Sequence, residues 1–371
     1  MANDLYGSFG GREFSQKLST EFYARVARDP LLRPLFPTTF RCAIEQFAAF
    51  LSQFLSGPPE DTQQRWWLSI QASHQRFPIG APERDAWLRV MNETLEQVEM
   101  PERCRQSLRE LFKVSSAYIA RQPESSAIED PQIRLRWEVQ VALEQAVARI
   151  HVGDFDQALA SAQAPPLKEF FTRDRAVHAH FLALLIRSGG ALEHVDSEVK
   201  ADPELAAVRH TFNRTLLHEA GASGRAGLTQ RLLRLGADPN AGTHSPLYSV
   251  ANECQNDREG ARTVRILAAA GADVNARDPK QQTTPLHMAA RRGSPLIAEA
   301  LIECGAHIDP RDSTGDTPLR RAINCRRPDV ARLLLAHGAN PDSLGSKQLT
   351  PRTAARDAKM RAVFLPDARG I

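Results

Sequence analysis

The chain has 371 residues, of which 42% are hydrophobic and 25% charged, and its 47 Lys and Arg against 44 Asp and Glu give a formal net charge of +3. This composition is typical of a globular protein with two or three domains, and it excludes a disordered chain or a strongly basic nucleic-acid-binding protein. The longest apolar runs, such as LALLI at 182–186, are far shorter than the roughly 18 residues that a membrane span needs, and the N-terminus lacks an apolar signal core. We therefore expect a cytoplasmic protein that binds neither nucleic acid nor a membrane.

The charge is unevenly distributed along the chain, and the cysteine spacing argues against some kinds of site. Residues 211–371 carry 23 Lys and Arg against 16 Asp and Glu, whereas residues 1–210 carry 24 against 28, so the C-terminal part is the basic one. The five cysteines are widely spaced and form no C-x-x-C pair, which argues against a zinc site or redox cycling. We expect reduced thiols that pack as small hydrophobic side chains, with a redox role for Cys42 as the alternative.

Residues 13–122 have the periodicity of successive amphipathic helices. Apolar residues recur every four positions from Phe14 to Val26, and three prolines in RDPLLRPLFP then end that helix. The next helix has one broad apolar face and stops at Ser56-Gly57-Pro58-Pro59; that face is Phe40, Ala43, Ile44, Phe47, Phe50, Leu51 and Phe54. Two further helices open at Pro82 and Pro101. By periodicity alone, these aromatic stripes indicate a packed core more readily than a cofactor lining.

The order of three segments favours a more specific interpretation. FYARVARDPLLRPLFP at 22–37, FLSQFLSGPP at 50–59 and HQRFPIGAPERDAWLRVM at 74–91 together resemble a group II truncated haemoglobin. The resemblance covers residues 6–122, so we assign residues 1–122 to a globin domain. It implies a two-on-two helical fold that binds haem b and, through the haem iron, dioxygen or another diatomic ligand.

The resemblance also assigns roles to individual residues. His74 matches the proximal histidine, which makes it the metal ligand. Tyr23 and Trp87 match the two distal hydrogen-bond donors, and Phe36 matches the aromatic residue that stacks on the porphyrin. On the same basis Ala43 and Phe47 face the bound ligand, and Cys42 lies beside them, where we expect buried packing.

Two departures from the family pattern leave a haem-free globin open. The chain has RWWLSI at 65–70 where relatives have a G-H-P-like segment, and Ser56-Gly57 replaces a glycine pair. The loop ahead of His74 is therefore expected to differ in shape, and the affinity for haem depends on that loop.

The connecting region, residues 123–210, predicts a helical linker or eroded repeats. Its first eight residues are polar, and IRLRWEVQVAL then alternates apolar and polar residues as a strand does. We nevertheless expect a helix, because ALEQAVARI continues it with helix-forming residues and no turn signal intervenes. We expect residues 131–210 to cover the apolar face of the repeats that follow.

The C-terminal part repeats two phrases. The first phrase begins at Thr215, Ser245, Thr284, Thr317 and Thr350, with start-to-start spacings of 30, 39, 33 and 33 residues. The second phrase has glycines at 236, 271, 305 and 338, each 21 residues after the first phrase except in the second unit, where the interval is 26. We place the five extra residues between the two helices of that unit, near NECQNDREGA, and expect a trimmed loop before it.

The pattern of each unit predicts a helix, a turn, a second helix and an extended finger-like loop. Thr284 can cap the first helix, and Gly305 follows the second helix where a left-handed residue is needed. The T-P-L-H-x-A-A phrase with G-A-D-x-N resembles ankyrin repeats over residues 211–364, with a tail at 365–371. Arg320 replaces the usual histidine and Arg326 the usual glycine of the fourth copy.

The resemblances imply an all-α chain with two binding functions. Ankyrin arrays bind proteins and carry no catalytic groups, and three arginine pairs, at 291–292, 320–321 and 326–327, point either to an acidic partner or to a solvated basic face. No hydrolase triad, P-loop or zinc set is present to suggest an enzyme. Our leading hypothesis is a haem-based sensor or adapter. A haem enzyme that removes nitric oxide or peroxide and a haem-free protein-interaction scaffold remain the alternatives.

Overall fold

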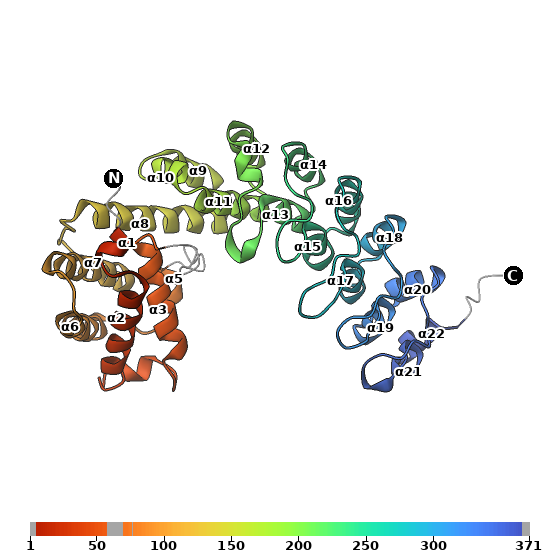
Figure 1. Ribbon diagram of the computed structural model, residues 1–371, viewed down its shortest axis with the longest axis horizontal. Helices are drawn as coiled ribbons and strands as arrows, with labels where there is room; N and C mark the ends of the chain where they lie inside the picture. The colour runs from red at the N-terminus through yellow and green to blue at the C-terminus, as the bar shows by residue number, and fades with distance from the viewer. Residues whose placement is uncertain (1–4, 58–69, 76, 366–371) are drawn as a thin grey trace. The chain divides into compact units, whose positions relative to one another are not determined.

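The computed structural model describes residues 5–57, 70–75 and 77–365, and within these ranges every regular element is a helix (Figure 1). The predicted all-α class is therefore confirmed. The chain forms two compact units, Met1–Arg173 and Asp174–Ile371. No described helix is both long enough and apolar enough to cross a lipid bilayer.

The first unit begins with a small helical bundle. Helix α2 packs against α3 and α6, and α6 packs against α7. The described α-helices of this unit are α1 (Leu5–Ser8), α2 (Gly11–Val26), α3 (Arg41–Phe54), α5 (Ile70–His74), α6 (Ala81–Gln97), α7 (Glu102–Ala120), α8 (Pro131–Val152), α9 (Phe155–Gln163) and α10 (Leu167–Arg173).

The apolar stripes predicted from the sequence form the core of this bundle. Phe14, Leu18, Phe22 and Val26 are all at most 5% exposed, because a four-residue spacing keeps them on one side of α2. The proline-rich segment that follows holds only a short 3-10 helix at Arg33–Leu35, as its prolines require. The first helix and its end are therefore confirmed.

The connecting segment folds as the long helix α8, which confirms the helical prediction against the strand-like alternation. Asp130 caps its N-terminus by accepting hydrogen bonds from the backbone of Gln132 and Ile133, and Gly153 ends it in the left-handed conformation. Ile133 and Trp137 are buried in the same core as the preceding bundle. The alternation fails as a strand signal because α8 buries apolar residues on more than one side.

The second unit is a stack of helix pairs that follow one another along the chain (Figure 1). Its α-helices are α11 (Arg175–Ser188), α12 (Leu192–Ala201), α13 (Leu216–Ala222), α14 (Ala226–Arg234), α15 (Pro246–Glu253), α16 (Asp257–Ala269), α17 (Pro285–Arg292), α18 (Pro295–Glu303), α19 (Pro318–Asn324), α20 (Pro328–Ala336), α21 (Pro351–Ala354) and α22 (Ala358–Ala362). Of the predicted linker, α8–α10 lie in the first unit, whereas α11 packs against α13 and so covers the first helix of the predicted repeats.

The five-residue insertion lies mainly inside a helix, which corrects our prediction. Helix α16 has 13 residues where α14, α18 and α20 have 9, and only the fifth extra residue lengthens the turn before it. Four residues add about one helical turn, so the apolar face of α16 still meets α18.

The repeat motif is built as its residue types predict. Thr284 is the N-cap of α17, and the ring nitrogen Nδ1 of His287 accepts a hydrogen bond from its backbone N–H at 3.1 Å. The other ring nitrogen of His287 donates to the carbonyl of Asp316 in the next repeat, at 3.1 Å. Gly305 has φ +93°, the left-handed conformation expected after the second helix. The hydrogen bond between His287 and Asp316 is buried and joins this repeat to the next.

Candidate functional site

His74 is the last residue of α5 and is half-buried. Its Nδ1 lies 2.7 Å from the carbonyl oxygen of Ile70, one helical turn earlier, and 3.1 Å from Ser73 Oγ. Because a carbonyl oxygen can only accept, Nδ1 carries the hydrogen in the neutral ring, and Nε2 keeps its lone pair. Among the described residues none bonds to Nε2. The contacts of Nδ1 therefore fix the orientation of the ring, and Nε2 is the nitrogen with a lone pair for a metal ion.

A chain of aromatic rings leads from His74 to α2. The His74 and Phe77 ring centroids are 6.3 Å apart, Phe77 and Phe36 6.1 Å, and Phe36 and Tyr23 5.5 Å. All these rings are half-buried, so they pack on the core while keeping part of their surface open. Phe77 was not among the predicted site residues. Its position in the FPIG turn just after His74 is the only sequence signal that could have identified it.

Tyr23 and Trp87 are polar-tipped rings in the same cluster. Tyr23 packs within 5.5 Å of both Phe36 and Phe40, and burial raises the pKa of its hydroxyl to about 12. The Trp87 ring lies 5.3 Å from Phe22 on α2. Within the described ranges, neither the Tyr23 hydroxyl nor the Trp87 indole N–H has a hydrogen-bond partner.

Helix α3 brings Phe47 to the same cluster. The Phe47 ring lies 6.4 Å from Tyr23 and 5.7 Å from Phe22, and Ala43, one turn earlier, is half-buried. Cys42 is exposed, so the expected burial of this thiol is wrong. It precedes Ala43 by one residue, and the helical rotation of about 100° per residue takes it off the apolar face of α3.

The residues present fit a haem group. A haem iron needs one imidazole nitrogen from the protein, apolar surfaces for the porphyrin and few polar groups on the ligand side. His74, the aromatic rings and the Tyr23 and Trp87 donors supply these three elements. In the part of the chain that the structure describes, no cluster of three or more His, Cys, Asp or Glu could hold a bare metal ion. Of the two departures from the family pattern, the first five residues of RWWLSI, 65–69, lie outside the described residues. The other departure, Ser56-Gly57, is described, and Ser56 has a φ of 69°, in the left-handed region.

A second candidate site lies on the turns between the helices of successive repeats. Arg291, Arg292 and Arg327, with Gln255 and Cys325, line a groove of about 670 Å³, which we call the arginine groove. Two of the guanidinium groups bond to Asn252: Arg291 to its side-chain oxygen at 2.6 Å and Arg292 to its carbonyl at 2.9 Å.

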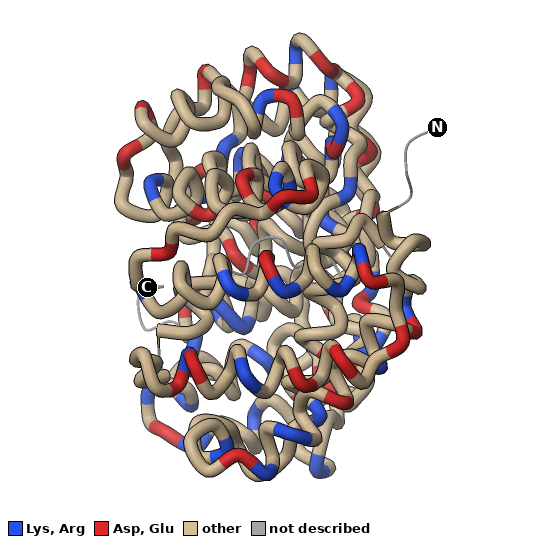
Figure 2. Tube along the Cα trace, turned by 90° about the vertical axis from the view of Figure 1, so that its left-hand side faces the viewer, with Lys and Arg blue, Asp and Glu red and all other residues tan. Residues whose placement is uncertain are grey.

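The third arginine of the groove is held by backbone. Arg327 Nε donates to the carbonyl of Arg291 at 3.2 Å. None of the three arginines has a carboxylate partner among the described residues, and Arg292 Nε is buried without a hydrogen bond. Figure 2 shows basic and acidic residues interspersed along the trace.

The predicted arginine cluster is smaller than expected, because three of its members are engaged elsewhere. Arg320 is 3% exposed and donates to the carbonyls of Leu349 and Thr350, at 2.7 and 2.9 Å. It joins two repeats as the usual histidine does. Arg321 pairs with buried Asp312, and Arg326 Nε lies 3.2 Å from an Asp357 carboxylate oxygen. These three side chains therefore have structural partners.

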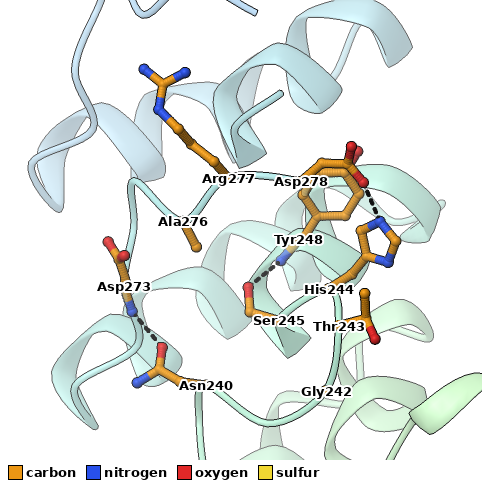
Figure 3. Close-up of a pocket in the computed structure, with 10 residues that line it drawn as sticks. All are labelled: Asn240, Gly242, Thr243, His244, Ser245, Tyr248, Asp273, Ala276, Arg277 and Asp278. Carbon is orange, nitrogen blue, oxygen red and sulfur yellow. Dashed lines mark hydrogen bonds and ion pairs between the residues drawn. The ribbon is translucent and has the colours of Figure 1, made fainter. Parts of the chain in front are cut away.

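A pocket of about 280 Å³ lies beside the loops that follow α14 and α16 (Figure 3). His244 Nε2 and Asp278 Oδ2 meet there at 2.5 Å, and Ser245 Oγ accepts the backbone N–H of Tyr248 at 3.2 Å. These polar groups satisfy one another and hold neighbouring repeats together. The sequence carries no signal for the His244–Asp278 pair, since the two residues are 34 positions apart.

Comparisons with known proteins also divide the chain into an N-terminal globin and C-terminal repeats. A family model described as a bacterial-like globin matches residues 4–120, and one described as ankyrin repeats matches residues 254–344. The group 2 truncated hemoglobin YjbI of Bacillus subtilis is 32% identical over 123 residues, which are 33% of this chain and 92% of that protein.

The repeats resemble segments of much longer proteins. The ankyrin repeat and SOCS box protein 16 of Homo sapiens is 35% identical over 149 residues, 37% of this chain and 32% of that protein. The neurogenic locus notch homolog protein 1 of Danio rerio is 29% identical over 274 residues, 66% of this chain but only 11% of the relative. The chain thus spans a minor part of both proteins. Taken with the helical bundle around His74, the comparisons show that the chain belongs to the group 2 truncated hemoglobin family and carries ankyrin repeats in its C-terminal part.

Proposed function

We propose that the chain is a haem-binding globin that takes dioxygen or another diatomic ligand and holds a protein partner on its ankyrin repeats, acting as a haem-based sensor or adapter. The observation that carries the haem assignment is the geometry of His74. Its Nδ1 is committed to the Ile70 carbonyl, and this leaves Nε2 as the only ring nitrogen that can bind iron.

The other residues of the cluster have complementary roles in this proposal. Bound haem supplies an iron that takes a diatomic ligand. Phe36 and Phe77 offer ring faces to the porphyrin, while Phe47 and Ala43 keep the ligand side apolar. The hydroxyl of Tyr23 and the indole N–H of Trp87 donate hydrogen bonds to a polar ligand. Because the pKa of Tyr23 is about 12, its hydroxyl keeps its hydrogen throughout the physiological pH range.

The arginine groove supports an acidic protein segment as the partner. Guanidinium groups bind carboxylates through charge-assisted hydrogen bonds, and the three in the groove have no carboxylate of their own among the described residues. Arg291 is exposed, so an acidic side chain can reach it from solvent. We assign Asp and Glu residues of a protein partner to this groove.

Absorption spectra test the haem assignment. The full chain is titrated with haemin, and ferric, ferrous and carbonmonoxy spectra are recorded for the wild type, His74→Ala and the exposed control His151→Ala. We expect a one-to-one Soret band that shifts or collapses in His74→Ala and is unchanged in the control. Absence of a His74-dependent band would leave a haem-free scaffold. Sustained turnover of nitric oxide or peroxide with an added reductant would favour an enzyme instead.

Peptide binding tests the groove. The probe is a fluorescein-labelled peptide of ten glutamates, and its anisotropy is measured with the wild type, Arg291→Ala/Arg327→Ala and the control Arg234→Ala/Lys280→Ala, which removes the same charge from exposed positions elsewhere. We expect the groove variant to lose about tenfold in affinity and the control to change little. Equal losses would mean non-specific attraction. If the peptide binds equally well to the ferric, ferrous and dioxygen-bound protein, the globin does not regulate the repeats, and the sensor hypothesis fails.

A further inference from the structure

Helix α8 belongs to the globin unit although it lies beyond the residues that the globin family model matches, 4–120. Ile133 is fully buried in the globin core, and the Trp137 ring stands edge-on to Tyr118 of α7 at 5.5 Å and 89°. An extra helix is therefore packed into this globin as part of its core.

A carboxylate on α8 reaches the start of α5. Glu144 is 7% exposed, and its Oε1 accepts hydrogen bonds from the backbone N–H of Ile70 and from Gln140 Nε2, the latter at 3.3 Å. Its Oε2 accepts the hydroxyl of Tyr118 at 3.2 Å. No described basic side chain pairs with Glu144, so three neutral donors stabilise this buried charge. Losing any one of them is costly, because a buried carboxylate cannot find water instead.

A second contact fixes the same end of α5. Gln71 Nε2 donates to the backbone carbonyl of Tyr118 at 3.0 Å. The first two residues of α5 are thus both held by Glu144 or by its partner Tyr118. The described part of α5, Ile70–His74, is too short to be held by its own helical hydrogen bonds alone, so these contacts help to fix its position.

Ile70 joins this anchor to the imidazole. Its N–H is bound to Glu144, and its carbonyl oxygen accepts the Nδ1 hydrogen of His74 at 2.7 Å. One residue of α5 therefore stands between the carboxylate of α8 and the ring, with a hydrogen bond on each side. A shift of either end changes the geometry of the other.

We propose that Glu144 is a positioning residue that sets the place and tilt of the His74 ring through Ile70, and that it transmits movements of His74 to α8. This inference rests on the proposed haem function and adds the residue that links the metal ligand to the helix beyond the globin. Partners that orient a ligating histidine typically account for 10- to 100-fold in metal affinity.

The test uses the haemin-loaded full chain of the wild type, Glu144→Ala, Glu144→Gln and Glu138→Ala. Glu138 is exposed on the same helix and serves as the matched control. Two quantities are measured: the rate of haemin loss to excess apomyoglobin, and the iron–histidine stretching frequency of the ferrous protein by resonance Raman spectroscopy. We expect Glu144→Ala to lose haemin about tenfold faster and to shift or broaden the stretching band.

The other variants make the result specific. Glu144→Gln keeps an oxygen for the Ile70 N–H, so it should restore the stretching band towards that of the wild type, and Glu138→Ala should match the wild type. Wild-type values for both quantities in a folded Glu144→Ala would overturn the inference. If Glu144→Ala does not fold, Tyr118→Phe removes one donor and should produce a smaller shift of the same band, whereas an unshifted band would overturn the inference.

The Soret band of the wild type distinguishes failure of the haem assignment from failure of the inference about Glu144. If the wild type forms no His74-dependent Soret band, the proposed function fails, and the anchor is then tested by amide hydrogen exchange in the haem-free chain. Faster exchange at residues 70–74 in Glu144→Ala than in Glu138→Ala would support the anchoring role of Glu144. Equal exchange would overturn it.

Discussion

Replacing Tyr23 by Phe isolates the contribution of one hydroxyl group to ligand retention. The change keeps the ring, which packs within 5.5 Å of Phe36 and Phe40, so the core should be undisturbed. The hydroxyl has no hydrogen-bond partner among the described residues. Removing it therefore breaks no hydrogen bond among the described residues, and the free energy of unfolding should change little.

The expected effect follows from that missing partner. In the proposed function, the Tyr23 hydroxyl gives its single hydrogen to the ligand and shares it with no other described group. A hydrogen bond to a charged or strongly polarised acceptor contributes about 1.5 to 3 kcal/mol. Since about 1.4 kcal/mol is a factor of ten, Tyr23→Phe should raise the dioxygen dissociation rate about 10- to 100-fold.

Stopped-flow mixing of the dioxygen complex with carbon monoxide or dithionite measures this rate. The matched control is Tyr248→Phe, which removes a hydroxyl that bonds to Thr283 Oγ1 at 3.0 Å in the second unit. The control should leave the rate unchanged. A Tyr23→Phe rate within a factor of two of the wild type would refute the assignment of Tyr23 as a ligand donor and would leave Trp87 as the main one.

Three further predictions concern stability. Burial lowers the pKa of both His210 and His218 from 6.5 to about 4, so the unfolded chain binds protons below pH 6.5 that the native chain does not bind until about pH 4. The free energy of unfolding should therefore decrease as the pH is lowered, by about 2 kcal/mol per histidine between pH 7.5 and pH 5. Identical urea midpoints at these two pH values would contradict this. His287→Ala should destabilise the repeats by about 2 to 4 kcal/mol in urea unfolding, because it opens a cavity and leaves the Thr284 N–H and the Asp316 carbonyl without their partner; exposed His337→Ala is the control. A globin fragment ending at residue 122 should unfold at a lower temperature than one ending at 173, because the shorter one lacks the buried side chains of α8; equal midpoints in circular dichroism would show that α8 does not stabilise the globin.

The sequence by itself predicted the features that repeat locally. The four-residue spacing from Phe14 to Val26 places one face of α2 in the core, and glycines such as Gly305 mark the helix ends where left-handed backbone is needed. The two resemblances, to a truncated haemoglobin and to ankyrin repeats, rest on such patterns and are confirmed. These properties depend on residues within a turn or two of one another, or on a fixed repeat, and both can be read from the chain directly.

Only the tertiary structure decided which polar groups are paired. Arg320 and Arg321 look like a surface pair in the sequence, yet Arg320 is buried against carbonyls of the next repeat, 29 and 30 residues away. The contact between Glu144 and Ile70 joins residues 74 positions apart, and no local pattern marks Glu144 as different from exposed Glu138. A buried charge is stabilised by the hydrogen-bond donors that the packing of distant helices brings to it. Local sequence patterns do not predict which distant helices pack together.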